Sequence, residues 1–199
     1  MSQISLVGAG PGPLELLTLR ALHRLEAAEV VVYDRLVGSE ILARIPHGAA
    51  RFDVGKRCGE PSPTQEEINA LLLALARTGK RVVRLKGGDP LVFGRGGEEA
   101  LHLARHGIEA ELVPGITAAL GCAASSFIPL THRGLARSLT LVTGHLMDER
   151  DYQGWQGLTR AGHTLVFYMG LERAARIREG MLRAGAPGCL LYTSPSPRD

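Results

Sequence analysis

The chain has 199 residues, of which 45% are hydrophobic and 22% are charged, and its formal net charge at pH 7 is +3. A chain of this length and composition can bury a sizeable core as one large domain or as two small ones. Its basic residues are scattered and only 5% of its residues are aromatic, so the sequence indicates no nucleic-acid-binding tail and no base-stacking surface. The mild basicity fits a small polyanionic substrate better than a nucleic acid.

The cysteines and the amino terminus bear on the compartment. The three cysteines are widely spaced and form no C-x-x-C pair, which favours free thiols in a reducing compartment. The first residues enter a strand without the basic and apolar regions of a signal peptide. Residues 116–130 form the longest stretch of low charge, and they are too few to span a bilayer. We therefore expect a cytoplasmic protein without a membrane segment.

Strands and helices are expected to alternate through the first part of the chain. Short β-branched runs predict strands over residues 4–7, 30–33, 51–54, 82–85 and 110–113. Apolar residues at helical spacing predict helices over residues 14–28, 41–45, 65–79 and 98–104. Thr64 and Glu67 have the spacing of a capping box at the start of the third helix. This alternation predicts an α/β fold with a parallel sheet and right-handed crossovers.

A second α/β unit is expected further along the chain. Residues 116–126 are mostly small and predict a helix that allows close approach of another backbone or of a ligand. Strands are expected over residues 138–143 and 164–168, and a last helix over residues 171–183. The sequence thus predicts a first domain over residues 1–115, a connecting helix and loop over 116–137, and a second domain over 138–188.

The loop from Leu85 to Glu99 is the most unusual segment of the sequence. It joins an expected strand to an expected helix and contains two glycine pairs, at residues 87–88 and 96–97. Glycines let a main chain adopt positive φ or approach a ligand closely, and Pro90 restricts Asp89 to an extended backbone. Ligands of open α/β sheets bind beyond the carboxyl ends of the strands, where this loop lies. Gly-Asp-Pro is also common in structural turns, and both interpretations stay open.

Two other motifs give weaker indications. The spacing Gly8-x-Gly10-x-Gly12, with an acid at Asp34, resembles a dinucleotide-binding fingerprint. However, Pro13 replaces the third glycine, and a proline at position 11 removes a main-chain donor where a pyrophosphate would bind. Histidines at positions 102 and 106 lie four residues apart, but outside an H-E-x-x-H frame, so no metal site is predicted.

Seven segments between Leu6 and Arg133 carry a distinctive combination of motifs. They read Gly-Ala-Gly-Pro-Gly, Val-Tyr-Asp-Arg-Leu-Val, Gly-Lys-Arg, Gln-Glu-Glu-Ile-Asn, Leu-Lys-Gly-Gly-Asp-Pro-Leu-Val-Phe-Gly-Arg-Gly-Gly-Glu-Glu, Val-Pro-Gly-Ile-Thr-Ala and Ile-Pro-Leu-Thr-His-Arg. Together they resemble the uroporphyrinogen-III C-methyltransferases, which are tetrapyrrole methylases. A weaker resemblance continues through Thr143-Gly144-His145 and Phe167-Tyr168-Met169-Gly170.

The resemblance implies a fold, a cofactor and a reaction. It implies two α/β domains of the tetrapyrrole methylase type, which bind S-adenosylmethionine in the cleft between them, usually in a homodimer. By motif, the residues that would line the cofactor site are Pro11, Gly87, Gly88, Asp89, Val92, Thr117, Ala118 and Met169. The implied reaction needs no metal. It methylates C2 and C7 of uroporphyrinogen III and gives precorrin-2 for sirohaem or cobalamin synthesis.

The same resemblance assigns roles to charged residues. Asp34 would accept a proton and Lys56 would donate one; a carboxylate within hydrogen-bond reach of a pyrrole N–H suits the first role. The alternative for Asp34 is a helix-cap or turn residue. The substrate bears eight carboxylates, and arginine can bind a carboxylate through two hydrogen bonds. The arginines expected to receive them are Arg35, Arg57, Arg95 and Arg133, although each also fits a solvated surface charge.

The end of the sequence departs from the family. Cys189-Leu190-Leu191-Tyr192 is followed by Thr-Ser-Pro-Ser-Pro-Arg-Asp, which cannot supply central strands. Residues 189–199 are therefore expected to be a non-native tail, and the second domain is expected to be incomplete. The open alternatives are a sibling methyltransferase acting on a later precorrin, a folded but inactive fragment and, remotely, a dinucleotide-binding module.

Overall fold

The computed structural model describes residues 4–55, 62–144, 157–159, 162–186 and 188. The chain forms two compact units, the first reaching Gly121 and the second starting at Cys122. This division falls within helix α5 (Ala118–Ser125), and the domain limits given above stay predictions. In the described ranges, Cys122 is a free thiol and no helix is long and apolar enough to cross a membrane.

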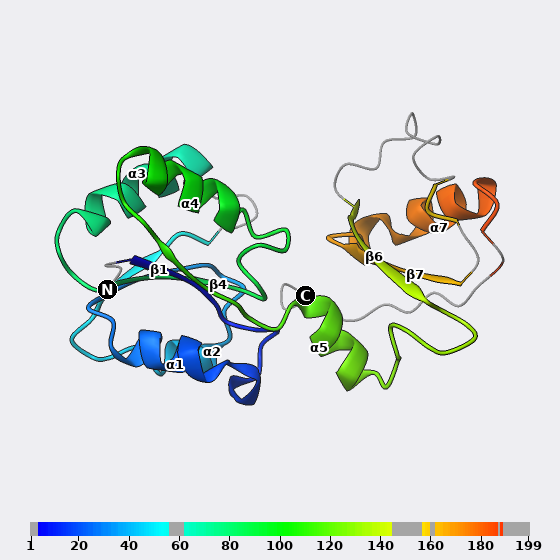
Figure 1. Ribbon diagram of the computed structural model, residues 1–199, viewed down its shortest axis with the longest axis horizontal. Helices are drawn as coiled ribbons and strands as arrows, with labels where there is room; N and C mark the ends of the chain where they lie inside the picture. The colour runs from blue at the N-terminus through cyan, green and yellow to red at the C-terminus, as the bar shows by residue number, and fades with distance from the viewer. Residues whose placement is uncertain (1–3, 56–61, 145–156, 160–161, 187, 189–199) are drawn as a thin grey trace. The chain divides into compact units, whose positions relative to one another are not determined.

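The first unit is built on a five-stranded sheet in the order β3-β2-β4-β1-β5 (Figure 1). Its strands are β1 (Ile4–Gly8), β2 (Val30–Tyr33), β3 (Ala50–Asp53), β4 (Val82–Lys86) and β5 (Glu111–Val113). Every neighbouring pair is parallel. The predicted strands agree with these bounds to within one residue at each end, and the predicted parallel sheet is confirmed.

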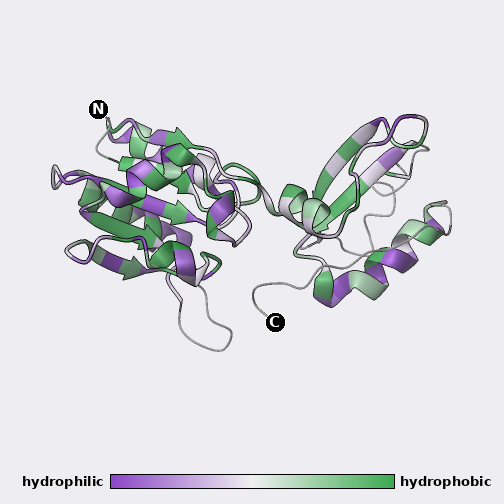
Figure 2. Ribbon diagram, turned by 90° about the horizontal axis from the view of Figure 1, so that it is seen from below, coloured by the Kyte–Doolittle hydropathy of each residue, from purple (hydrophilic) through white to green (hydrophobic). Residues whose placement is uncertain are grey.

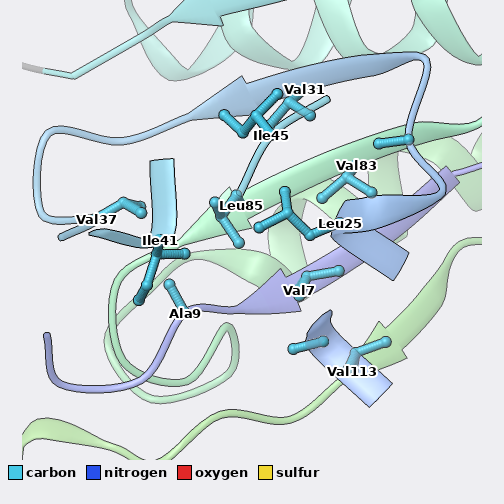
Figure 3. Packing of buried hydrophobic residues seen from close by; sticks show 12 residues of the cluster. Val7, Ala9, Leu25, Val31, Val37, Ile41, Ile45, Val83, Leu85 and Val113 are labelled. Atoms are coloured by element: carbon cyan, nitrogen blue, oxygen red, sulfur yellow. The ribbon is translucent and has the colours of Figure 1, made fainter. Parts of the chain in front are cut away.

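Helices cover both faces of this sheet (Figure 1). Helices α1 (Leu19–Glu26) and α2 (Ser39–Leu42) lie on one face, and α3 (Gln65–Ala76) and α4 (Gly96–Arg105) lie on the other. Figure 3 shows the core on the α1 side, where Leu25 and Ile41 pack against Val7, Val31 and Leu85 of the strands. A second core lies on the α3 side. Burial on both faces explains why β1 and β2 are nearly continuous apolar runs.

The helix predicted over residues 14–28 is wrong in its first part. A short 3-10 turn, η1 (Leu14–Leu16), is followed by two extended residues, and α1 begins only at Leu19. Thr18 has ψ of 148°, and its hydroxyl accepts a hydrogen bond from the Ala21 amide at 3.2 Å. Thr18 therefore caps a new helix and does not continue the preceding turn. The second predicted helix, over residues 41–45, is replaced by α2, which starts earlier.

The capping box predicted for the third helix is confirmed. The Thr64 hydroxyl accepts from the Glu67 amide at 3.2 Å, and the Glu67 carboxylate accepts from the Thr64 amide at 2.7 Å. The bond from the Thr64 amide, and next a bond of 3.0 Å from the Thr64 hydroxyl to the same carboxylate, hold the pKa of the Glu67 carboxyl below its usual value. Because both donors would otherwise lack a helical partner, the box fixes the start of α3 at Gln65.

The second unit contains a parallel strand pair and a helix. Strands β6 (Ser138–Thr143) and β7 (His163–Tyr168) pair along their full lengths, and the 3-10 turn η4 (Leu171–Arg173) leads into α7 (Ala174–Arg183). Hydrophilic and hydrophobic segments alternate along α7 in Figure 2, as expected for a helix that buries only one side. The expected tail over residues 189–199 lies outside the described residues.

Candidate active site

Two neighbouring strands of the first unit send their connections in opposite directions. β1 and β4 are adjacent in the sheet. The chain leaves β1 toward β2, which lies beyond β4, and it leaves β4 toward β5, which lies beyond β1. Open α/β sheets form a ligand crevice at such a point, beyond the carboxyl ends of the strands. The two glycine-rich loops, residues 8–12 and 87–97, follow these strands, so the topology places both loops at the edge where a ligand would be expected.

The loops after β1, β4 and β5 approach one another so closely that only glycines fit. A Cβ on Gly8 would lie 2.6 Å from the Gly115 nitrogen, and a Cβ on Gly115 would lie 2.2 Å from the Gly88 carbonyl oxygen. Gly10 and Gly88 also exchange main-chain hydrogen bonds of 3.1 and 2.7 Å, with Gly88 at φ +65°. This edge of the sheet is therefore bordered by main-chain atoms held in fixed positions.

Asp89 links the loop after β4 to the loop after β5 through hydrogen bonds. One carboxylate oxygen accepts a hydrogen bond from the Leu91 amide at 2.8 Å, and the other accepts from the Gly115 amide at 3.0 Å. The Val92 amide donates to the Asp89 carbonyl oxygen at 3.3 Å. These contacts support the turn interpretation of Gly-Asp-Pro, while direct binding of a cofactor by Asp89 and Val92 stays a prediction.

Several other predicted cofactor residues lie together in the first unit. A Cβ on Gly88 would be 3.8 Å from the Ala118 nitrogen and 3.9 Å from the Thr117 Cα. A Cβ on Gly121 would lie 2.5 Å from the side chain of Pro11, so this proline packs directly on α5. The structure thus brings the loops after β1 and β4 to the first turn of α5.

The rest of the long glycine loop is held in an uncommon backbone conformation. Gly87 lies against the Leu36 side chain, 2.7 Å from where its Cβ would be. Phe93 and Arg95 have φ of 52° and 59°, which side-chain-bearing residues rarely adopt. Arg95 donates to Glu98 through two nitrogens, at 2.9 and 2.6 Å. This pairing raises the pKa of Arg95 and lowers that of Glu98.

Asp34 follows β2 at the same edge of the sheet. Its amide donates to the Leu85 carbonyl oxygen at 3.3 Å, and its side chain is 26% exposed. Arg84 Nη2 donates to Asp34 Oδ1 at 2.6 Å, while Lys86 Nζ lies 3.8 Å from Oδ2. The carboxylate is therefore held at one oxygen and partly open to a ligand.

The partners of Asp34 belong to a buried cluster of charges. Arg84, Lys86 and Glu99 are 2%, 3% and 0% exposed. Glu99 Oε1 accepts from Lys86 Nζ at 2.9 Å, from Arg84 Nε at 3.3 Å and from Gln65 Nε2 at 3.2 Å. Within the described ranges, its second oxygen is buried without a hydrogen-bond partner. Burial, and next the charge of Arg84, lower the pKa of Lys86, while the two carboxylates raise it.

Sequence reasoning missed this cluster. The signal was present, because Arg84 and Lys86 alternate with apolar residues in a strand that is otherwise a buried run. Charged residues are almost never fully buried unless they are paired. Two cations on one face of an expected central strand therefore predict carboxylate partners, and Asp34 was the nearest candidate.

The remaining predicted residues are not gathered around Asp34 by the described contacts. Arg35 is exposed beside Asp34 and lies against Gly55. Arg133 and Met169 belong to the second unit, where Met169 is 50% exposed and has φ of 53°. Lys56 and Arg57 lie outside the described residues.

The histidine pair lies at the carboxyl end of α4, after Glu99. The rings of His102 and His106 lie 4.7 Å apart on α4, and His106 Nδ1 is 2.9 Å from the His102 carbonyl oxygen. Among the residues with a described placement, no group of three or more His, Cys, Asp or Glu side chains could hold a metal ion.

Comparison with known proteins establishes the family. The sequence profile of the tetrapyrrole (corrin/porphyrin) methylases matches residues 3–191, and the chain belongs to this family. Tetrapyrrole methylases use S-adenosylmethionine as their methyl donor. The chain is 54% identical over 183 residues to a siroheme synthase of Edwardsiella ictaluri, and this match covers 92% of the chain and 40% of the relative. The chain thus spans less than half the length of the curated relatives that it matches.

Solved structures share the fold. The native form of uroporphyrin III C-methyl transferase from Thermus thermophilus matches with a TM-score of 0.78 and 47% identity, over 92% of this chain and 77% of that one. A second structure of the Thermus thermophilus enzyme, complexed with S-adenyl homocysteine, matches with a TM-score of 0.77, 47% identity and cover of 92% and 76%. The predicted fold class, α/β of the tetrapyrrole methylase type, is confirmed.

The loops of the first unit suit a small ligand that is contacted largely through main-chain atoms. A Cβ on Gly8 or Gly115 would clash with a neighbouring loop, whereas a Cβ on Gly12 would meet nothing within 4 Å. Pro11, Asp89, Val92 and Thr117 are each only partly buried, so their surfaces remain accessible. These features fit the family's methyl donor.

Proposed function

We propose that this chain transfers methyl groups from S-adenosylmethionine to C2 and C7 of uroporphyrinogen III and so forms precorrin-2. The observation that carries the proposal is the partly exposed carboxylate of Asp34, held by Arg84 at 2.6 Å at the sheet edge that also carries the glycine loops. The 47% identity to a uroporphyrin III C-methyl transferase, over 92% of the chain, supports this choice of substrate.

The proposed chemistry depends on positioning and on one proton transfer. When bound, S-adenosylmethionine supplies an electrophilic methyl group. A pyrrole carbon becomes nucleophilic as the ring N–H loses its proton, and Asp34 accepts that proton. Arg84 occupies Oδ1, which leaves Oδ2 to receive it. The glycine loops, fixed by their mutual contacts, hold the reactants in line and exclude water. A methyl-transfer displacement gains most of its rate from such positioning and water exclusion.

Basic residues would receive the carboxylates of the substrate. Arg35 and Arg133 are exposed, and Arg95 is half exposed and paired with Glu98. Arg95 would therefore exchange the Glu98 carboxylate for one from the substrate. We also assign substrate binding to Arg57 and proton donation to Lys56, by motif alone.

The dinucleotide alternative loses support from the geometry of the first loop. A pyrophosphate would need main-chain donors there. The Gly10 amide instead donates to the Gly88 carbonyl oxygen at 3.1 Å, and Pro11 has no amide hydrogen. A sibling methylase acting on a later precorrin shares the family fold, and only the substrate used in the assay separates it from the proposed activity.

The proposed enzyme is cytoplasmic and assembles as a homodimer. Light scattering coupled to size-exclusion chromatography measures the mass directly. A mass twice that of the chain, independent of dilution over the working range, supports the dimer. A mass equal to that of the chain rejects it.

The decisive experiment is an anaerobic incubation of the purified chain with S-adenosylmethionine and enzymatically made uroporphyrinogen III, followed by mass spectrometry of the tetrapyrrole. A gain of two methyl groups establishes substrate and reaction. No gain, together with methylation of a later precorrin in a parallel incubation, assigns the chain to the sibling activity. No gain with either substrate, while S-adenosylhomocysteine still binds in calorimetry, identifies a folded but inactive chain.

A further inference from the structure

The guanidinium of Arg84 is held through all three of its nitrogens. Nη2 donates to Asp34 Oδ1 at 2.6 Å, Nε donates to Glu99 Oε1 at 3.3 Å, and Nη1 donates to the Leu85 carbonyl oxygen at 3.3 Å. Because a guanidinium is planar, these contacts fix its orientation. Arg84 therefore contacts Asp34 at one oxygen only, from a fixed direction.

The ammonium of Lys86 lies between two carboxylates and bonds to only one of them. Its Nζ is 2.9 Å from Glu99 Oε1 but 3.8 Å from Asp34 Oδ2. Lys86 is buried, so among the described residues these two carboxylates are its charged acceptors. Hydrogen bonds between charged groups are about twice as strong as hydrogen bonds between neutral groups. The ammonium of Lys86 therefore bonds to the carboxylate with which it forms the stronger hydrogen bond.

We propose that Glu99 is a positioning residue, which holds Lys86 away from Asp34 and so keeps Asp34 Oδ2 free to accept a proton. The charged groups nearest to Asp34 in the described part are Arg84 and Lys86 on β4, with Glu99 behind them on α4. Arg35 and Asp53 are exposed neighbours. Oδ2 is the oxygen that Arg84 leaves unoccupied, and the inference rests on the proposed role of Asp34.

Glu99→Gln is the sharpest test, because glutamine keeps an oxygen acceptor for Arg84 and removes the charge that attracts Lys86. The ammonium then turns to Asp34, and a crystal structure should show Nζ within about 3 Å of Oδ2. With Oδ2 occupied, kcat should fall about tenfold or more, while KM and the affinity for S-adenosylhomocysteine stay unchanged.

The double variant Lys86→Met, Glu99→Gln tests whether the loss of turnover in Glu99→Gln comes from the new position of Lys86 or only from the changed charge of the cluster. It removes the ammonium that would occupy Oδ2, so kcat should return to within about threefold of the wild type. Glu111→Gln is the matched control, because it removes a carboxylate paired with Arg24 in the same unit and should leave kcat unchanged.

Two results would overturn the inference. One is a Glu99→Gln structure in which Lys86 Nζ stays bonded to residue 99. The other is a loss of kcat that the double variant does not reverse. A wild-type chain that methylates no tetrapyrrole refutes the proposed function instead, and the position of Lys86 in the Glu99→Gln structure still decides whether Glu99 restrains it.

Discussion

Gly115 lies so close to Gly88 that a Cβ on Gly115 would come within 2.2 Å of the Gly88 carbonyl oxygen. The clashing atom belongs to the main chain, and it also accepts a hydrogen bond from Gly10. Gly115→Ala should therefore displace whole loops, lowering the free energy of unfolding by roughly 2–4 kcal/mol and weakening the binding of S-adenosylhomocysteine. Urea denaturation and calorimetry measure the two effects.

The control for this substitution is Gly97→Ala. Gly97 is exposed in α4, and its Cβ would meet nothing within 4 Å. Alanine favours a helix interior over glycine by about 1 kcal/mol, so this variant should be neutral or more stable than the wild type. Equal losses in the two variants would contradict the steric explanation.

Asp34→Asn tests the proposed proton acceptor. Asparagine keeps the shape and one oxygen acceptor for Arg84, but it cannot take up a proton at neutral pH. Turnover should fall about 10²- to 10⁴-fold, the range typical of a lost general base, while S-adenosylhomocysteine still binds. Wild-type turnover in this variant would remove Asp34 from the base role.

Thr64→Ala should weaken the start of α3 without affecting chemistry. The Thr64 hydroxyl accepts from the Glu67 amide at 3.2 Å, and loss of such a cap costs about 1 kcal/mol. Thr64→Ser, which keeps the hydroxyl, should retain most of the stability. A change in turnover at saturating substrate would show that α3 influences the site more than its contacts indicate.

The ion pair between Arg24 and Glu111 should make stability depend on pH. Two nitrogens of Arg24 donate to Glu111 at 2.6 and 2.9 Å; this pairing, and next Ser5, hold the pKa of the Glu111 carboxyl below its usual value. A lowered carboxyl pKa contributes stability above the unfolded-state value, and that stability is lost as pH falls through the folded-state value.

The difference in stability between the wild type and Glu111→Gln should therefore be full at pH 7. It should shrink as pH falls below about 4.3, the pKa of a free glutamate. Urea midpoints at several pH values measure it. A difference that grows toward acid pH would mean that the carboxylate is unfavourable in the folded state.

β1 and β2 were predictable because each is a short apolar run buried on both faces, and the capping box was predictable because its spacing is local. The break before α1 was not predicted, because the leucines of residues 14–28 have helical spacing whether or not Thr18 interrupts the helix. Local patterns report periodicity, and only the extended backbone at Thr18 shows where one helix ends and another starts.

The candidate site was predictable in part. Glycine clusters and Asp34 are visible in the sequence, but the partners of Asp34 are not, because Arg84 reaches it from fifty residues away in sequence. Asp89 is recognisable as a turn or ligand residue, and only its bond to the Gly115 amide shows that it joins two loops. The roles of Lys56, Arg57 and Met169 stay predictions.

The two faces of β4 also bear on how the sheet selects its register. Val83 and Leu85 face the core on the α1 side, while Arg84 and Lys86 face α4 and its glutamate. A slip of β4 by one residue would turn both cations into an apolar core and leave Glu99 buried without a counter-charge. Buried unpaired charges cost several kcal/mol. The charges that surround Asp34 thus also penalise misaligned pairing of the central strand during folding.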